Sequence, residues 1–499
     1  MKKMFFLTTM VVCCVMFVSA QGLQMLWNKS NYSWNTGGAN RDATVYKGKF
    51  YLPVNGGTTV RVLEGADGSE LTSISSLHSS FSLAVDNAGN LIVPKNGGGS
   101  QSWNLQYVNL GTGVITPVTG WPVGQNIPIR ADNIDIRGNI TSGTAYVVGV
   151  GSAGQIQVWE IVNGAVSDQN PKFTATKSEA GGTGADIRWI DDKRFLTTGQ
   201  SRTPTIMTVN FSASPFITKV EPINIGTGPL ATIDCGGGVV FELAGIPYLV
   251  RPDGGTIANG VRAGVISIHD ITNLNSPKKI GGNTAPTILG TGANTMIRVA
   301  IYAEKIADNE AIVYVWACDH GAAAYKVEAV KTPVLSPASG EYDIEEGQTL
   351  EVTLDCDTED AEISYSIESS NPSAAPLRAD VVYDGTPLQL PAGSHTITMK
   401  ATKAGLFDNI SKATYDITAV VAAGAVIADN IRVVAANGQI SITSNNPIQS
   451  VKLIDLQGRI IASKKVSAKN CTLAAPAKGV YIVETFTGGL RNVQKVSVR

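Results

Sequence analysis

The stretch Ser82–Pro94 reads SLAVDNAGNLIVP and contains a complete β-hairpin signal. Two short apolar runs flank the turn Asp86–Asn90, whose glycine and asparagines supply the positive φ angles that tight hairpins require. Arg41–Val54 and Ala185–Gly199 repeat this arrangement around other polar turns. Because Val, Ile, Thr and Tyr dominate such runs along the chain, the sequence predicts short antiparallel strands.

The hairpin recurs roughly every 40–60 residues from about residue 36 to residue 331, a period that favours a β-propeller. No amphipathic run of about 12 residues indicates a helix, so the expected fold class is all-β. Six blades are favoured, and their unequal spacing leaves seven open. A β-sandwich or an open β-solenoid is the alternative. The expected blades begin near Asp42, Leu83, Ile134, Ile187, Ile233 and Ile297.

A ring of blades closes only if its last blade gains a strand from elsewhere, which removes the free sheet edges. Leu23–Lys29 (LQMLWNK) is an isolated strand before the first blade, and we expect it to be this clasp. Gly264–Gly282 resembles the outer hairpin of propellers with LVIVD-type repeats. The region as a whole resembles uncharacterised secreted propellers of Bacteroidetes, a resemblance that implies a fold and no activity.

A second module follows, and its motif residues resemble the immunoglobulin-like module at the C-terminus of chitobiases and hexosaminidases. Ile367–Ser370 replaces the central T-x-D-G-S turn of that family, so no role of that turn is carried over. In those enzymes the module accompanies a catalytic domain, which implies a carbohydrate setting. The matching residues are Pro333, Ser336, Pro337, Gly340, Tyr342, Ile363, Tyr365, Asn371, Pro372, Tyr383, Pro387, Ala401, Gly405 and Ser411.

The last seventy residues contain Val451–Gly458 (VKLIDLQG) and Pro476–Glu484 (PAKGVYIVE), followed by a closing strand. This order resembles the C-terminal sorting domain of the type IX secretion system of Bacteroidetes. The resemblance implies an immunoglobulin-like β-sandwich that addresses the protein to that machinery. The residues that carry it are Asp455, Gly458, Arg459, Asn470, Leu473, Gly479, Val480, Tyr481, Lys495, Val496 and Val498.

The N-terminus has the pattern of a secretory signal peptide. Met1–Lys3 is positively charged, Met4–Phe17 is apolar, and Val18–Ala20 places small residues before a cleavage site after Ala20. The apolar run is shorter than the ~20 residues of a membrane span, so no transmembrane segment is expected. Cys13 and Cys14 lie inside the run, which disfavours the alternative of a lipoprotein.

These patterns divide the chain into a signal peptide (1–20), a β-propeller (21–331), an immunoglobulin-like module (332–419), a linker (420–430) and a sorting domain (431–499). The net charge of −2 conceals an asymmetry. Residues 332–419 carry 4 basic and 15 acidic side chains, whereas residues 420–499 carry 10 basic and 3 acidic ones. A solvated acidic face is the default interpretation. Attraction between the acidic module and the basic tail is the alternative.

Few residues indicate chemistry. His78, His269, His320 and His395 lack metal-ligand spacing, and the sequence has no nucleophile elbow, phosphate loop or dinucleotide fingerprint. We therefore expect no metal and no cofactor. Four cysteines remain after signal removal, and a bridge between Cys235 and Cys318 is the alternative to free thiols.

One constellation of charged residues lies where the innermost strands of the expected blades begin. Innermost strands line the propeller channel, so these side chains are candidates for one channel mouth. Two carboxylates about 5–10 Å apart could hydrolyse a glycosidic bond. The alternative is that aspartates cap turns and Arg–Asp pairs lock neighbouring blades. The catalytic candidates are Asp132, Asp135, Asp186 and Asp234, and the ligand-binding candidates are Arg41, Asp42, Arg130, Arg188 and Arg298.

Four tryptophans in or beside expected loops, Trp27, Trp34, Trp103 and Trp121, could stack on sugars or pack between blades. We expect an exported, non-catalytic binding or scaffold protein at the cell surface or outside the cell, with a glycan or host-matrix ligand. A propeller-based glycan-active enzyme and a structural surface component are the alternatives. The type IX machinery is the expected partner of residues 431–499. Nucleic acid is not an expected partner, because basic patches with interleaved aromatic residues are absent.

Overall fold

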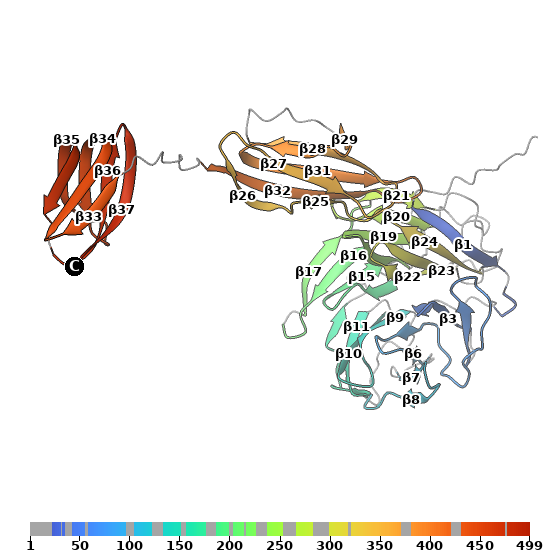
Figure 1. The fold of residues 1–499 in the computed structure, drawn as a ribbon. Coiled ribbons are helices and arrows are strands. Elements are labelled where there is room, and N and C mark those ends of the chain that lie inside the picture. Colours follow the sequence, from blue (N-terminus) through green and yellow to red (C-terminus); the bar gives the residue numbers. More distant parts are fainter. Residues whose placement is uncertain are drawn as a thin grey trace, which may run out of the picture.

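The computed structural model describes residues 22–30, 32–34, 42–54, 58–95, 104–121, 133–150, 156–175, 186–198, 203–213, 216–225, 237–252, 266–282, 299–317, 321–370, 381–420, 431–474 and 477–499. All regular elements in this part of the chain are β-strands, which confirms the expected all-β class. Figure 1 shows three regions along the chain: a ring of sheets, a sandwich and a separate C-terminal domain.

The described residues between Gly22 and Glu328 form six antiparallel sheets, which are the blades of a propeller. Blade 1 is β2 (Thr44–Tyr46), β3 (Lys49–Pro53) and β4 (Val60–Glu64); blade 2 is β5 (Ala84–Val85), β6 (Asn90–Pro94), β7 (Leu105–Asn109) and β8 (Ile115–Pro117); blade 3 is β9 (Asn133–Gly138), β10 (Thr144–Val150), β11 (Ile156–Val162), β12 (Ala165–Val166) and β13 (Phe173–Ala175). Blade 4 is β14 (Asp186–Trp189), β15 (Arg194–Thr198), β16 (Thr205–Val209) and β17 (Ile217–Pro222); blade 5 is β18 (Val239–Leu243), β19 (Ile246–Pro252), β20 (Ile266–Asp270) and β21 (Lys278–Gly282); blade 6 is β22 (Val299–Ala307), β23 (Glu310–Ala317), β24 (Gly321–Glu328) and β1 (Leu23–Ser30).

A separate hydrophobic cluster fills each gap between successive blades, so the sheets close into a ring. Phe50 and Leu63 of blade 1 pack with Trp316 of blade 6, and Leu196 of blade 4 packs with Leu249 of blade 5. The other four gaps are filled in the same way. The described part of the chain therefore confirms the favoured six blades. Of the six expected starting points, Ile233 and Ile297 lie outside the described residues.

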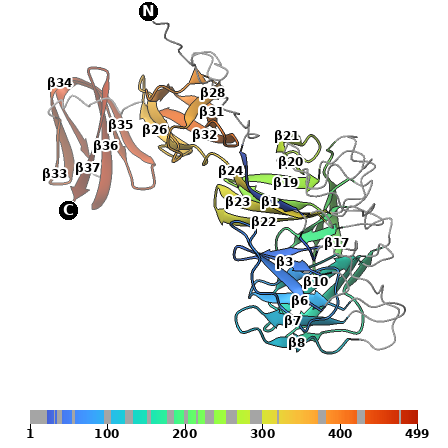
Figure 2. The same cartoon turned by 90° about the vertical axis from the view of Figure 1, so that its right-hand side faces the viewer.

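The expected clasp is confirmed. Strand β1 pairs antiparallel with β24 from Leu23↔Val327 to Ser30↔Gly321, and it supplies the outermost strand of blade 6. The indole of Trp27 donates a hydrogen bond to the carbonyl of Gly65 at 2.7 Å, which joins this strand to blade 1. The start of the fold thus completes its last blade, as Figure 2 shows from a second direction.

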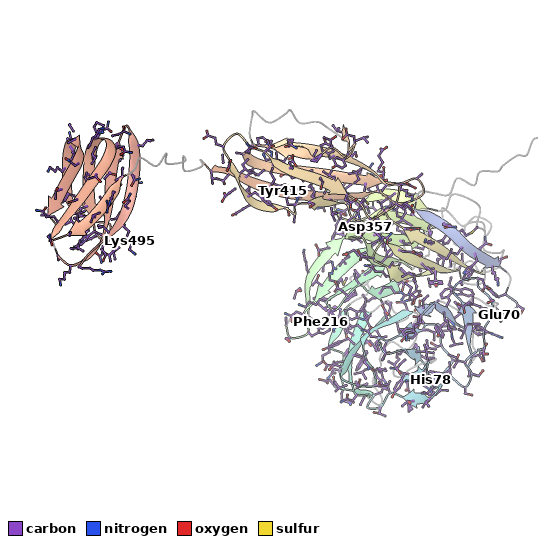
Figure 3. All side chains as sticks on the ribbon, viewed as in Figure 1. Glu70, His78, Phe216, Asp357, Tyr415 and Lys495 are labelled. Atoms are coloured by element: carbon purple, nitrogen blue, oxygen red, sulfur yellow. The ribbon has the colours of Figure 1, made fainter. Side chains whose placement is uncertain are left out.

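A two-sheet sandwich follows the propeller and includes the acidic segment. One sheet contains β25 (Val334–Ser336), β27 (Leu350–Asp355) and β30 (Leu388–Leu390); the other contains β26 (Gly340–Glu345), β32 (Asn409–Val420), β31 (Gly393–Thr402), β28 (Glu362–Ser369) and β29 (Val381–Val382). Strand β26 runs parallel to β32. Tyr415, labelled in Figure 3, lies between the sheets, and its hydroxyl donates to the carbonyl of Pro337 at 2.7 Å.

The C-terminal domain is a five-stranded unit with its own core. Its strands are β33 (Arg432–Ala436), β34 (Gln439–Ile454), β35 (Ile460–Ala474), β36 (Gly479–Thr487) and β37 (Leu490–Val498). All members of its hydrophobic cluster lie between Ile431 and Val498. The turn after β34 is built by Asp455, whose carboxylate accepts hydrogen bonds from the backbone N–H of Gln457 and Arg459.

Candidate functional site

Asp42 lies just before the innermost strand of blade 1 and is fully buried. Its Oδ1 accepts hydrogen bonds from the backbone N–H of Ala43 at 2.8 Å and from the hydroxyl of Tyr302 at 3.1 Å. Its Oδ2 accepts from the side-chain amide of Asn133 at 2.8 Å. The guanidinium of Arg188 also contacts Oδ1 directly. One carboxylate therefore joins side chains from blades 3, 4 and 6 to blade 1.

Arg188 projects from β14 of blade 4 and is only 3% exposed. Its Nη1 lies 2.9 Å from Oδ1 of Asp186, and its Cζ lies 4.2 Å from the ring centroid of Tyr302. Blades 1 and 4 lie opposite each other in a six-membered ring, so the contact between Arg188 and Asp42 crosses the ring axis.

Blade 3 is joined to blade 4 by two further hydrogen bonds beside the guanidinium. The side-chain oxygen of Asn133 accepts from the backbone N–H of Ile187 at 2.8 Å. Oδ2 of Asp135 accepts from the backbone N–H of Trp189 at 2.7 Å, and Oδ1 accepts from that of Ile136 at 2.9 Å. We call the set Asp42, Asn133, Asp135, Asp186, Arg188 and Tyr302 the Arg188 network.

The charges of the Arg188 network do not balance. Burial raises the pKa of Asp186 to about 7 and that of Asp135 to about 6, although Arg188 opposes both shifts. Burial also raises the pKa of Asp42 against the opposing effect of Arg188. Burial alone would lower the pKa of Arg188, but Asp186 and Asp42 hold it above its usual range. The three carboxyl groups of the network thus share one permanent positive charge, that of Arg188.

The structure brings together four of the nine residues that the sequence singled out, namely Asp42, Asp135, Asp186 and Arg188. They meet near the ring axis in a network that joins blades. Asp186 is 4% exposed, and its Oδ2 has no hydrogen-bond partner among the described residues. The remaining five candidates lie outside the described residues: Arg41, Arg130, Asp132, Asp234 and Arg298.

Sequence reasoning missed Asn133 and Tyr302. Asn133 lies two positions before Asp135 on the same strand, so their side chains point to the same face of the sheet. This spacing could have identified Asn133 from the sequence. Tyr302 lies four residues after Arg298 in an ordinary apolar strand, and we find no signal that marks it.

The described tryptophans are used for packing. Trp27 is 8% exposed and lies against Gly68 of blade 1. Trp34 stacks on Trp316 at 5.8 Å, and the guanidinium of Arg61 lies 5.7 Å from its ring. Trp121 meets Trp159 edge to face. Trp103 lies outside the described residues.

Histidines and other potential ligands form no metal cluster in the part of the chain that the structure describes. His269 is hydrogen-bonded to Ser267, and His395 to the carbonyl of Pro391. His320, Cys235 and Cys318 lie outside the described residues, and so does the predicted signal peptide. Across the described residues, no helix has the length and apolar character that crossing a membrane requires.

Fold and network define a closed β-propeller, locked near its axis, that is followed by two smaller β-domains. Residues 436–499 match the family model described as the secretion system C-terminal sorting domain, and this segment is a type IX sorting domain. The C-terminal domain, 431–499, is called the sorting domain below. It indicates export to the cell surface or the extracellular space. No curated protein matches the sequence.

Several solved structures share a distant similarity with the chain. The extracellular domain of the hybrid two-component system BT3049 from B. thetaiotaomicron is 13% identical, with 80% of this chain and 57% of that chain covered and a TM-score of 0.33. PorZ, a surface component of the type IX secretion system of Porphyromonas gingivalis, is 11% identical, with 91% and 64% covered and a TM-score of 0.29. The Pan2 WD40 domain of Neurospora crassa is 9% identical, with 62% and 96% covered and a TM-score of 0.37. Because these TM-scores lie below 0.5, the similarities do not establish the fold of this chain, and the propeller assignment rests on the chain's own sheets.

Proposed function

We propose that the protein is a non-catalytic binding or scaffold protein of the cell surface or extracellular space, with a glycan or matrix ligand for its propeller. The Arg188 network supports the non-catalytic part of this proposal, because Asp42 and Asp135 are engaged in joining blades. Both oxygens of Asp42 and of Asp135 accept internal hydrogen bonds. A glycosidase needs two carboxyl groups that face an open site from either side of the scissile bond.

The test combines binding and turnover on the same purified protein. Polysaccharides, mucin-type glycans and collagen would be immobilised on an array, and the same glycans would be incubated with the protein and searched for released oligosaccharides. We expect retention on at least one ligand and no released product. Product release that Asp186→Asn abolishes and the exposed control Asp192→Asn preserves would overturn the proposal in favour of a glycan-active enzyme. If the protein shows neither binding nor turnover, the result would favour a structural surface component.

We further propose that a signal peptide is removed after Ala20 and that residues 431–499 engage the type IX machinery. The positive, apolar and small-residue pattern of residues 1–20 and the sorting domain support this route. A reporter fused to residues 427–499 behind its own signal peptide should cross the outer membrane of a host with this machinery. The matched control is a fusion with Asp455→Ala, which removes the acceptor of the turn after β34. Retention of the intact fusion in the periplasm would contradict the proposal.

The sandwich is proposed to be an immunoglobulin-like module of the chitobiase type. The motif residues Tyr342, Ile363, Tyr365 and Tyr383 belong to its core or pack against it, which supports the proposal. Two packed sheets with a shared apolar interior are the architecture that such modules have.

A further inference from the structure

The loop between β31 and β32 of the sandwich reaches the propeller and pairs with it through the backbone. Phe407 forms a parallel bridge with Ala329, just beyond the end of β24. Its N–H donates to the carbonyl of Glu328 at 3.0 Å, and its carbonyl accepts from Val330 at 2.9 Å. The N–H of Gly22, directly before the clasp strand, donates to the carbonyl of Gly405 at 2.7 Å. The loop thus holds both strands of the propeller's closing pair.

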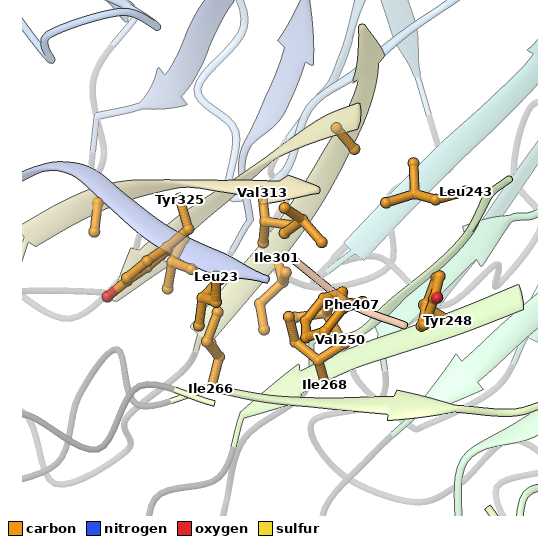
Figure 4. Packing of buried hydrophobic residues seen from close by; sticks show 14 of the residues in the cluster. Leu23, Leu243, Tyr248, Val250, Ile266, Ile268, Ile301, Val313, Tyr325 and Phe407 are labelled. Atoms are coloured by element: carbon orange, nitrogen blue, oxygen red, sulfur yellow. The ribbon is translucent and has the colours of Figure 1, made fainter. Parts of the chain in front are cut away.

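The side chain of Phe407 belongs to the propeller core. It is 2% exposed and lies in the cluster that fills the gap between blades 5 and 6, as Figure 4 shows. Its ring stacks on Tyr248 of blade 5 with centroids 5.7 Å apart. Gly22 has φ +69°, and a Cβ added there would lie 2.4 Å from the Phe407 ring. Only glycine leaves room for this ring at the start of the clasp.

Asn409 ties the same loop to a third element, the turn between β18 and β19. Its side-chain amide donates to the carbonyl of Ala244 at 3.2 Å and to that of Val330 at 3.1 Å. The hydroxyl of Thr332 donates to the carbonyl of Ala244 at 2.9 Å. Asn409 is 1% exposed, so these bonds are made away from water, where a lost partner is costly.

We propose that Gly405–Asn409 is a second clasp of the propeller, so that the ring and the sandwich fold and open as one cooperative unit. The ordinary expectation for neighbouring domains is a polar interface across which they move independently. Here an aromatic side chain of the sandwich completes an apolar cluster of the ring. The clasp strand β1 cannot leave β24 without exposing this cluster. The sandwich thereby holds the propeller closed after export.

The experiment compares the full-length mature protein with Phe407→Ala and with the control Ile410→Ala, an exposed position at the start of β32. Calorimetry would count the thermal transitions, and hydrogen exchange would follow the amides of β1. Apart from the transition of the sorting domain, we expect the native protein and the control to show one joint transition. In Phe407→Ala, the joint transition should split into two, and the amides of β1 should exchange about tenfold faster than in the native protein.

Two outcomes would overturn the proposal that ring and sandwich form one cooperative unit. The first is a native protein in which ring and sandwich already melt separately. The second is a Phe407→Ala protein that keeps one joint transition and native exchange in β1. If Phe407→Ala yields no folded protein, Phe407→Leu is judged by the same two criteria, because leucine keeps an apolar group at the site while losing the stacking on Tyr248.

Discussion

At the scale of single residues, the Arg188 network makes the stability of the protein depend on pH. Asp186 and Asp135 have folded-state pKa values of about 7 and about 6, both above the usual aspartate value because the groups are buried. Well below pH 4 these groups are protonated in both folded and unfolded chains, so they add no pH-dependent penalty to folding. As the pH rises toward 7, the unfolded chain releases protons that the folded chain retains. The contribution of these groups to the free energy of unfolding therefore falls, and the full penalty is present above pH 7.

The raised pKa of Asp186 predicts how the stability of Asp186→Asn changes with pH. Asparagine keeps a hydrogen-bond acceptor beside Arg188 and carries no titratable proton. Between pH 5 and pH 8, the variant should become more stable relative to the native protein, by on the order of 2 kcal/mol. Urea denaturation at each pH measures this difference, and Asp192→Asn, 86% exposed, should show no such trend. A constant difference across the pH range would show that Asp186 is ionised throughout.

Removing Arg188 should be far more damaging than removing a surface arginine of the same blade. Arg188→Met leaves Asp42 and Asp186 buried without their positive partner, which should cost about 3–5 kcal/mol of unfolding free energy. Arg194→Met breaks the pair with Asp191, whose two side chains are 48% and 41% exposed, and should cost about 1 kcal/mol or less. Denaturant titration at pH 7 compares the two. Equal losses would mean that the buried network contributes no more to stability than an exposed ion pair does.

The repeat explains why much of this network could be predicted. Innermost strands begin at comparable points in each blade, so Asp42, Asp135, Asp186 and Arg188 could be grouped before their contacts were known. The hydrogen bonds that the backbone N–H groups of Ile187 and Trp189 donate to Asn133 and Asp135, respectively, each span 54 residues. Whether a carboxylate faces a ligand or a neighbouring blade depends on burial. Burial depends on contacts across the ring that no local pattern encodes, and Tyr302 illustrates this.

At the scale of elements, the clasp strand offers a matched pair of positions. Trp27 is 8% exposed and joins blade 6 to blade 1, whereas Met25 on the same strand is 49% exposed. Trp27→Ala should lower the free energy of unfolding by about 3–5 kcal/mol, because it empties a large buried site and removes a hydrogen bond. Met25→Ala should change it by about 0.5 kcal/mol or less. Thermal denaturation of the two variants provides the comparison, and similar melting temperatures would argue against β1 as a structural clasp.

Hairpins and the clasp were predictable because turn residues and the need to close sheet edges are visible in the sequence. The parallel pairing of β26 with β32 was not predictable in the same way. Its partners, from Gly340↔Tyr415 to Glu345↔Val420, are 75 residues apart and share no turn. The loop Gly405–Asn409 was equally hidden, because Phe407 looks like any apolar residue until its cluster is assembled from two blades.

At the scale of the molecule, the two smaller domains differ in whether they contribute residues to the hydrophobic core of the propeller. The sandwich contributes Phe407 to the core of the ring. The cluster of the sorting domain contains only its own residues. Its carboxylates Asp455 and Glu484 are paired with arginines or a lysine of the same domain. Residues 420–499 carry 10 basic against 3 acidic side chains, whereas residues 332–419 carry 4 basic against 15 acidic ones.

This contrast predicts the effect of removing the sorting domain. A mature chain that ends at residue 430 should keep the joint melting temperature of propeller and sandwich within about 2 °C, because no shared core is lost. Calorimetry at about 0.15 M and about 0.5 M salt also tests attraction between the acidic and basic domains, since the Debye length falls from about 8 Å toward a few ångströms over this range. A shift on truncation that disappears at high salt would reveal electrostatic docking. A large shift at both salt concentrations would show that the sorting domain shares an apolar interface with the rest of the chain.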